Sequence, residues 1–463
     1  MLVARSWMRP ASKVLQKVVF TIACLAMLIV PKPGVCQTTG NAVPPSRAPD
    51  PYELKYREVQ RAILVFKQGE HDAAREILAA AKAKHAELPA IDVMMARLYL
   101  AAGEVSKAEH ALERATIDVP DDPEGFLLLG DLALRSNRSV FAELAYDRAT
   151  QILNHYDASP DRKQNLQIRV LAGLASLAEN RGQYQRAASL LKAWIELDPN
   201  SPLAIGSLGR VTFHSKDYDQ ARTAFQQLSE LAPTSPPVEI AMGRLFAETS
   251  MHDQAYNEMT TAAKQYANDT RVLLTVGEWA LHNGLLSLAQ QTVTDALKLD
   301  EQSLEGQVLS ARLARYAGDH DSAESLLGKL MPLHPNSILL ADEFARTLAT
   351  SGDEQKRKAA LIHAERNYRV LRKKKSPMLL QAIVTYAWTL LNNGQADKAQ
   401  AVVQSLPDGS SISNENGFYV ASIYAGREKK EVAIKMLKSL LADERPFPLR
   451  NEAEHLLARL TNA

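Results

Sequence analysis

Three adjacent histidine–aspartate pairs are the first residues in this sequence that suggest catalysis: His71-Asp72, His252-Asp253 and His320-Asp321. A carboxylate beside an imidazole could orient a general base. The pairs, however, occur at turns that recur roughly every 34 residues, and no serine nucleophile or third ligand accompanies them. Motifs of zinc proteases, serine hydrolases and phosphate-binding loops are also missing. We therefore expect no enzymatic activity, no metal and no cofactor.

Five arginines share one position, directly after a small residue, and they are the main candidates for ligand binding: Arg97, Arg210, Arg244, Arg312 and Arg346. The planar guanidinium group can bind a carboxylate or a phosphate with two hydrogen bonds. Two interpretations stay open. The arginines could bind an anionic ligand, or they could pair with acids on neighbouring helices, for which the sequence offers Glu248, Glu278, Glu305 and Asp342.

A basic stretch from residue 356 to residue 375 is the second candidate surface. Within it only one acid, Glu365, accompanies nine cations: Lys356, Arg357, Lys358, Arg366, Arg369, Arg372, Lys373, Lys374 and Lys375. Cations at the end of a helix complement the helix dipole, which would be a purely structural role. The alternative is an anionic partner such as a lipid head group, a polysaccharide or a nucleic acid.

These candidates are positioned by a repeat of about 34 residues, of which eleven copies can be aligned. A small residue recurs in the first half of every copy: Ala62, Ala96, Gly130, Ala175, Gly209, Gly243, Gly277, Ala311, Ala345, Ala387 and Ala421. An alanine recurs in the second half of ten copies: Ala74, Ala108, Ala142, Ala187, Ala221, Ala255, Ala289, Ala323, Ala399 and Ala433. A larger apolar residue follows each of these alanines by one helical turn. Such a pattern predicts stacked helix-turn-helix units.

The sequence resembles a tetratricopeptide repeat (TPR) protein, because these small residues, the Gly-Asp-Tyr-like turns and the closing prolines match the pattern of that family. The resemblance implies an all-α superhelical solenoid of about eleven repeats that binds a protein partner. In the family the first helix of each repeat lines a concave groove. The resemblance thus places the five arginines in that groove, where an anionic peptide or polysaccharide would contact them.

Several features modify the regular array, which we assign to residues 55–447. Residues 157–167 are an insertion that we expect to lengthen the following helix from Ser159 onward. Residues 338–379 form an irregular, longer repeat whose second helix should be about one turn longer than the others. Residues 448–463 should form a capping helix with an apolar stripe at Leu456, Leu457 and Leu460.

The turns within the repeats carry glycines suited to a helix C-terminus, followed by residues suited to an N-cap. The glycines are Gly69, Gly103, Gly182, Gly284, Gly318, Gly352 and Gly394. The expected N-caps of the second helices are Asp72, Ser106, Asp219, Asp253, Ser287, Asp321 and Asp397.

The N-terminal region has the composition of an export signal. Basic residues precede an apolar run from Val18 to Val30, and no acid occurs before residue 50. We assign residues 1–36 as a signal peptide and residues 37–54 as a Pro-rich disordered tether. Cleavage would remove both cysteines, Cys24 and Cys36, and leave a mildly acidic protein, so we expect no nucleic-acid binding.

The sequence therefore predicts an exported, periplasmic or secreted, non-enzymatic binding scaffold in the cell envelope, of the kind that serves envelope assembly or exopolysaccharide export. Two alternatives stay open. The N-terminal segment could remain uncleaved and anchor the scaffold to the inner membrane, facing the periplasm. Alternatively, the protein could bind an anionic polysaccharide directly through its arginines.

Overall fold

The computed structural model describes residues 56–462 apart from 158, 375, 377, 408–411, 427–428 and 444. The predicted signal peptide and tether therefore lie outside the described residues. Every regular element among the described residues is an α-helix, which confirms the all-α prediction. The chain divides into two compact units, one ending at Leu245 and one beginning at Phe246, and each is described separately. No described helix is both long enough and apolar enough to cross a membrane.

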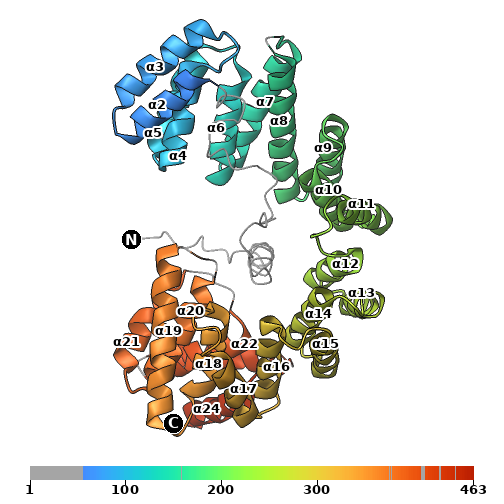
Figure 1. Cartoon of the computed structure of the whole chain (residues 1–463), viewed down its shortest axis with the longest axis vertical. Helices are drawn as coiled ribbons and strands as arrows, with labels where there is room; N and C mark the ends of the chain where they lie inside the picture. The colour runs from blue at the N-terminus through green and yellow to red at the C-terminus, as the bar shows by residue number, and fades with distance from the viewer. Residues whose placement is uncertain are drawn as a thin grey trace, which may run out of the picture. The chain divides into compact units, whose positions relative to one another are not determined.

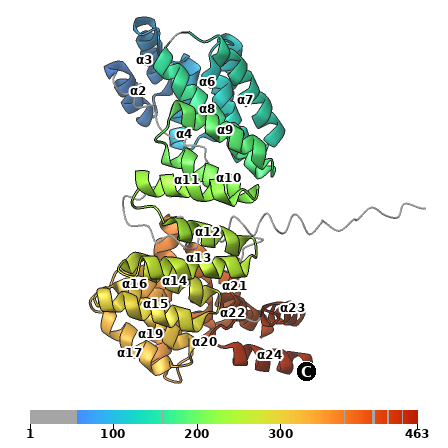
Figure 2. The same cartoon turned by 90° about the vertical axis from the view of Figure 1, so that its right-hand side faces the viewer.

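The N-terminal unit consists of helix pairs joined by short turns (Figures 1 and 2). The two helices of each pair pack against each other, and each pair packs against the next. The helices are α2 (Arg57–Lys67), α3 (His71–Lys84), α4 (Ile91–Ala102), α5 (Val105–Asp118), α6 (Pro123–Arg135), α7 (Ser139–Asn154), α8 (Pro160–Asn180), α9 (Tyr184–Leu197), α10 (Pro202–His214) and α11 (Tyr218–Leu231).

The next helix, α12 (Val238–Glu248), spans the division between the units. The C-terminal unit continues with the same paired arrangement and ends with one helix after the last pair. Its helices are α13 (His252–Gln265), α14 (Thr270–His282), α15 (Leu286–Leu299), α16 (Leu304–Tyr316), α17 (His320–Leu330), α18 (Ile338–Ala349), α19 (Glu354–Lys374), α20 (Leu379–Asn392), α21 (Ala396–Val403), α22 (Asn414–Ala425), α23 (Lys430–Leu441) and α24 (Arg450–Asn462).

The recurring small residues lie at the close contacts between the two helices of each pair. All ten predicted alanines of the second helices have no exposed surface, and the small residues of the first helices are buried as well. Glycine in the first helix accompanies a bulky partner in the second. A Cβ atom on Gly209 would lie 2.7 Å from Phe225, and one on Gly130 would lie 2.7 Å from Tyr146. The predicted register is therefore the one that the helices adopt.

The turns follow the glycine prediction in most repeats. All the predicted turn glycines except Gly352 have a positive φ, between 71° and 89°. In three other turns the left-handed position is occupied by Asn137, Lys216 and Ser250. The predicted N-caps were wrong, because each second helix begins one residue before the predicted cap and its N-cap lies two residues before it. In α11 and α17 the N-caps are Asp217 and Asp319, whose carboxylates accept hydrogen bonds from the backbone at Gln220 and Ser322.

Both irregular repeats contain a long helix. In α8, which has 21 residues, Ser159 is the N-cap and Pro160 begins the helix, as the insertion predicted. The second helix of the other irregular repeat, α19, also has 21 residues, against 14 in α11 and α15. It is thus about two turns longer, not one. The last helix, α24, packs on α22 and α23 through Ala453 and Leu456, and its role as a cap stays a prediction.

Candidate binding surfaces

The histidine–aspartate pairs have structural positions. His71 begins α3 and stacks on Phe66, with 4.4 Å between the ring centroids. His252 and His320 likewise begin α13 and α17, and the aspartate that follows each of them lies in the first helical turn. Acids in a first turn interact favourably with the helix dipole. Among the described residues no group of three His, Cys, Asp or Glu side chains could hold a metal ion.

In the N-terminal unit, two of the five predicted arginines pair with carboxylates. The side chain of Arg97 on α4 is 5% exposed and pairs with Glu124 on α6, whose side chain is 1% exposed. Arg162, on the extension of α8, also contacts Glu124 at 2.8 Å. Arg210 on α10 holds Glu179 on α8 with two hydrogen bonds, of 2.6 Å from Nε and 3.0 Å from Nη2. Both arginines therefore have an acid partner on a neighbouring first helix.

In the C-terminal unit, Arg312 lies between acids from both sides. Its Nε donates to Glu343 on α18 at 2.9 Å, and its Nη1 donates to Glu278 on α14 at 2.6 Å. Arg346 on α18 is 4% exposed, contacts Asp342 at 2.9 Å and donates to Asn416 on α22 at 2.9 Å.

Arg244, the fifth arginine, lies half-buried on α12 and takes part in an intramolecular interaction of its own. Its position resembles those of the other four, in which the guanidinium group is already engaged within the chain. This arrangement favours the structural interpretation, although ligand binding by the five arginines itself stays a prediction.

A buried ion-pair network around Arg315 was not predicted from the sequence. Arg315 on α16 is 3% exposed and contacts Glu343 at 3.0 Å and Glu415 on α22. Glu415 also lies 3.4 Å from Arg346 and accepts a hydrogen bond from Tyr419. Side chains of α16, α18 and α22 are thereby joined into one network.

The network lowers the pKa values of two of the carboxyl groups that it contains. Burial alone would raise the pKa of Glu343, but Arg312, Arg315 and Arg346 outweigh it and lower the pKa to about 2. Arg315 and Arg346 also lower the pKa of Glu415, although burial acts in the opposite direction. Both carboxylates therefore remain ionised at neutral pH, and the arginines are neutralised within the protein.

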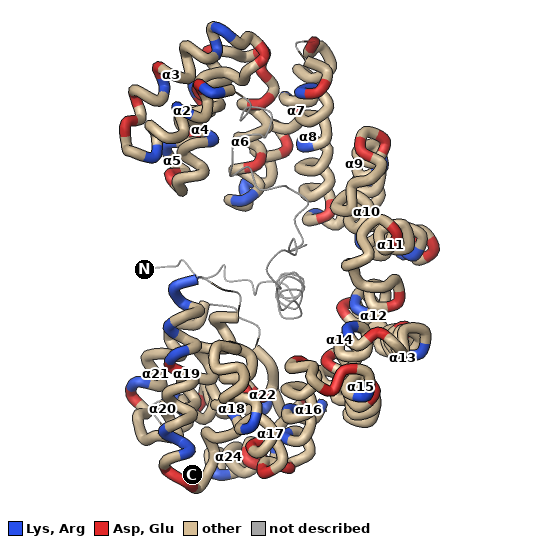
Figure 3. Tube along the Cα trace, in the orientation of Figure 1, with Lys and Arg blue, Asp and Glu red and all other residues tan. Residues whose placement is uncertain are grey.

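Four cations of the basic stretch on α19, whose Lys and Arg positions are blue in Figure 3, have partners outside that stretch. Lys356 pairs with Glu324 on α17 at 2.5 Å, and Lys358 pairs with Glu354 at 2.7 Å. Arg357 donates to the carbonyl oxygens of Ser351 and Gly352, and Arg366 donates to Pro335 and Asn336 on the preceding loop. Most of the predicted patch is therefore not a free positive surface.

The C-terminal end of α19 is different. Arg372, Lys373 and Lys374 are exposed, and none of them has a carboxylate partner among the described residues. Lys375 lies outside those residues. Because the last turn of a helix carries partial negative charge, the dipole offsets part of this positive charge.

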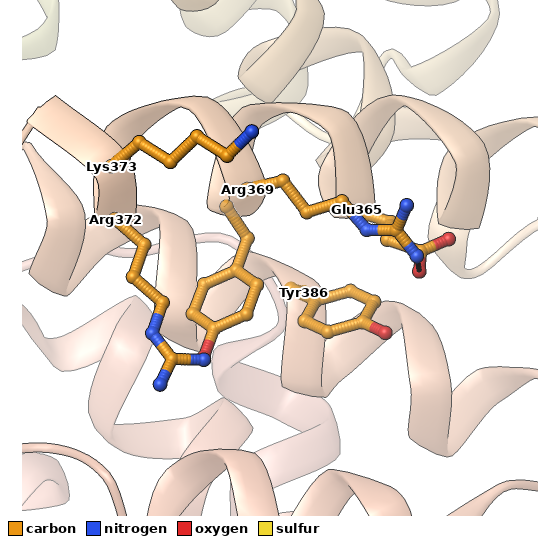
Figure 4. Close-up of a pocket in the computed structure, with 6 residues that line it drawn as sticks. Glu365, Arg369, Arg372, Lys373 and Tyr386 are labelled. Carbon is orange, nitrogen blue, oxygen red and sulfur yellow. Dashed lines mark hydrogen bonds and ion pairs between the residues drawn. The ribbon is translucent and has the colours of Figure 1, made fainter.

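An open pocket of about 740 Å³ lies at this end of α19, which we call the tyrosine pocket (Figure 4). Its lining comes from α19 and α20: Glu365, Tyr368, Arg369, Arg372, Lys373 and Tyr386. The two tyrosine rings are stacked, with centroids 5.2 Å apart and an interplanar angle of 21°. Arg372 lies over Tyr368, 5.9 Å from its centroid, and donates to its hydroxyl group at 3.3 Å.

One acid lies at the opposite end of the tyrosine pocket. Glu365 pairs with Arg369 at 2.6 Å. Burial and the nearby Glu365 carboxylate raise the pKa of Tyr386, so its hydroxyl group stays protonated at neutral pH. The pocket therefore has an acid-bearing end that is internally paired and a cationic end at Arg372 and Lys373. The basic stretch of the sequence indicated these two cations, but no sequence pattern indicated either tyrosine.

Two segments of the chain, residues 65–132 and 180–245, match the model of the tetratricopeptide repeat. No curated protein matches the chain. Solved structures that resemble it include yeast Tom70, at 16% identity and a TM-score of 0.37, covering 89% of this chain and 96% of that one.

Two further structures resemble shorter parts of the chain. PilF of Pseudomonas aeruginosa is 19% identical, with a TM-score of 0.29, and the match covers 55% of this chain and 96% of that one. PilW, titled a widely conserved type IV pilus biogenesis factor, is 15% identical, with a TM-score of 0.33 and coverages of 47% and 95%. At such identities and scores these structures do not bear on the function. Residues 65–132 and 180–245 are thus similar to the tetratricopeptide repeat, and they lie within an all-α array of helical repeats.

Proposed function

We propose that this protein is a non-enzymatic scaffold that binds a protein partner. The observation that carries the proposal is the match of residues 65–132 and 180–245 to the tetratricopeptide repeat, a module that generally serves protein–protein interaction. The arginines of the first helices support the proposal as well. They pair with acids inside the array and stabilise it, so other surfaces would bind the partner. The histidine–aspartate pairs, which begin helices, add no catalytic arrangement.

We further propose that the scaffold acts in the cell envelope, in envelope assembly or exopolysaccharide export. The support is the basic, acid-free N-terminus with its apolar run from Val18 to Val30. N-terminal sequencing of the protein from its native host tests this step. A mature start near Gln37 agrees with export and cleavage, whereas an intact Met1 on a membrane-pelleted protein replaces it with the anchored form.

Crosslinking of the full chain in its native cells, followed by affinity purification, tests the scaffold itself. The expected result is one or a few proteins captured at constant ratio to the scaffold, and captured again from purified components. Specific retention of an acidic polysaccharide without any protein would overturn the proposal in favour of direct glycan binding.

A further inference from the structure

We propose that the tyrosine pocket binds an acidic segment of the partner protein. In this arrangement Arg372 and Lys373 bind the carboxylates of the segment, and an apolar side chain of the segment lies against Tyr368 and Tyr386. The inference rests on the proposed scaffold function, because it assigns a chemistry to the partner. It concerns a surface of α19 and α20 that is separate from the five arginines of the first helices.

Charge complementarity is the first argument. The cations in the first half of α19 have acids or carbonyl oxygens as partners, but Arg372 and Lys373 have no acid partner among the described residues. Arg372 makes one hydrogen bond, of 3.3 Å, to the hydroxyl oxygen of Tyr368, which leaves the other donors of its guanidinium group available. A guanidinium group beside a second cation is suited to bind carboxylates.

The tyrosine pair favours a peptide over a sugar or a nucleotide base. One face of each ring is turned to the other ring, and Arg372 lies over Tyr368. A base or a pyranose ring could therefore stack only on the outer face of either ring. The ring edges offer apolar surface for an aliphatic or aromatic side chain of a peptide.

The uneven charge of the pocket gives the bound segment a direction. Glu365 at one end is neutralised by Arg369, so that end offers a carboxylate no net attraction. The cationic end is about two helical turns away, at Arg372 and Lys373. We therefore expect the acids of the segment at that end and its apolar residue beside Tyr386.

Fluorescence anisotropy with the full-length protein tests this inference. The probe is a labelled ten-residue peptide of Glu and Asp with a central Leu-Phe pair, and the comparison peptide carries Gln and Asn instead of the acids. We expect salt-sensitive binding of the acidic probe and about tenfold weaker binding to the double variant R372Q/K373Q, because two charge-assisted contacts are lost. The comparison peptide should bind no better than the double variant binds the acidic probe.

The matched control is K356Q/K358Q, which removes the same charge from the same helix outside the pocket. Equal weakening by both double variants would mean general attraction to a positive helix and would overturn the inference. Absence of binding to the acidic probe would overturn it as well. Binding of oligogalacturonate or single-stranded DNA, but not of the acidic peptide, with the same dependence on Arg372 and Lys373 would replace the peptide with that other class.

Failure of the inference can be told apart from failure of the scaffold proposal. If wild type and R372Q/K373Q capture the same crosslinked partner equally well, the scaffold proposal stands and the tyrosine pocket is not its binding site. If wild type captures no partner, the scaffold proposal itself fails. Circular dichroism of each variant establishes that the compared proteins are equally folded.

Discussion

The arginines of the first helices and the cations at the end of α19 carry the same charge in opposite surroundings. Arg97 and Arg346 are each 4% exposed and contact carboxylates, whereas Arg372 and Lys373 are exposed and have no described acid partner. From the sequence, the arginines of the first helices were the stronger candidates for ligand binding, because they recur at the same position of the repeat. The structure shows that recurrence along an array can also supply a cation with an acid from a neighbouring repeat, as it does for Arg97, Arg210 and Arg312.

Breaking the buried network should have the largest effect. Replacing Glu415 by Gln leaves Arg315 and Arg346 without one of their carboxylates in a buried site. Removing one partner of a buried ion pair typically costs about 3–5 kcal/mol. Hydrogen exchange should show lower protection in α16, α18 and α22. The exposed Glu305 on α16 provides the control, and E305Q should leave the exchange unchanged. Equal protection in both variants would mean that the network contributes no net stability.

Acid should weaken the same network. The pKa of Glu343 is lowered from 4.5 to about 2 in the folded protein. The folded state is therefore stabilised above pH 4.5, and this contribution is lost as the pH falls towards 2, with a loss of about 3 kcal/mol. Urea unfolding at a series of pH values measures it. The variant E343Q should unfold more easily at neutral pH but should lose much less stability between pH 5 and 3. A parallel decline in both proteins would assign the acid sensitivity to other groups.

The half-exposed pair of Arg210 and Glu179 should have a smaller effect. The side chains are 23% and 18% exposed, so solvent screens the pair, and we expect R210Q to cost about 1.5 kcal/mol. Thermal unfolding measures the change, with K192Q on the exposed face of α9 as the charge-matched control. If R210Q instead leaves stability unchanged and weakens partner binding, Arg210 belongs with the ligand-binding cations and not with the structural ones.

The end of α19 should contribute least to stability. Replacing both Arg372 and Lys373 by Gln removes favourable interactions with the helix dipole and one hydrogen bond to Tyr368. We expect a loss of about 0.5 kcal/mol that disappears at high salt. A chemical denaturation series at two salt concentrations measures it. A loss as large as that of E415Q would show that these cations are structural, and the contrast between the two groups would then disappear.

Most of the fold could be predicted because its determinants are local and repeated. Ala62, Ala96 and Gly130 recur at a fixed spacing, and each is buried, as expected. The N-caps were harder to predict. Asp217 and Asp219 are both plausible caps by residue type, and only the observed start of α11 at Tyr218 distinguishes them.

The partners of the arginines were partly predictable. Glu278 was named as a possible partner and lies 34 residues from Arg312, about one repeat away. Glu179 lies 31 residues from Arg210, about one helical turn short of a repeat, so a search for acids at the repeat length alone would have missed it. By contrast, Arg315 and Glu415 are separated by 100 residues, and no repeat spacing indicates that contact.

The tyrosine pocket could not be predicted for a different reason. Tyr368 lies within the basic stretch, and Tyr386 directly precedes the small residue Ala387. Neither position suggests a pair. The rings meet because α19 is about two turns longer than the usual second helix, so its end reaches a different part of α20. The length of one irregular helix thus determines a site that its residue types alone do not show.

The 100-residue separation between Arg315 and Glu415 also means that the two residues are synthesised at different times. A ribosome adds about 5–20 residues per second, so α22 follows α16 after about 5–20 s. During that interval α16 and α18 can pair with their neighbours while Arg315 still lacks one of its two acids. We expect the nascent C-terminal unit to remain exposed to proteases and chaperones until α22 is complete, whereas each pair of the N-terminal unit can dock as soon as it emerges.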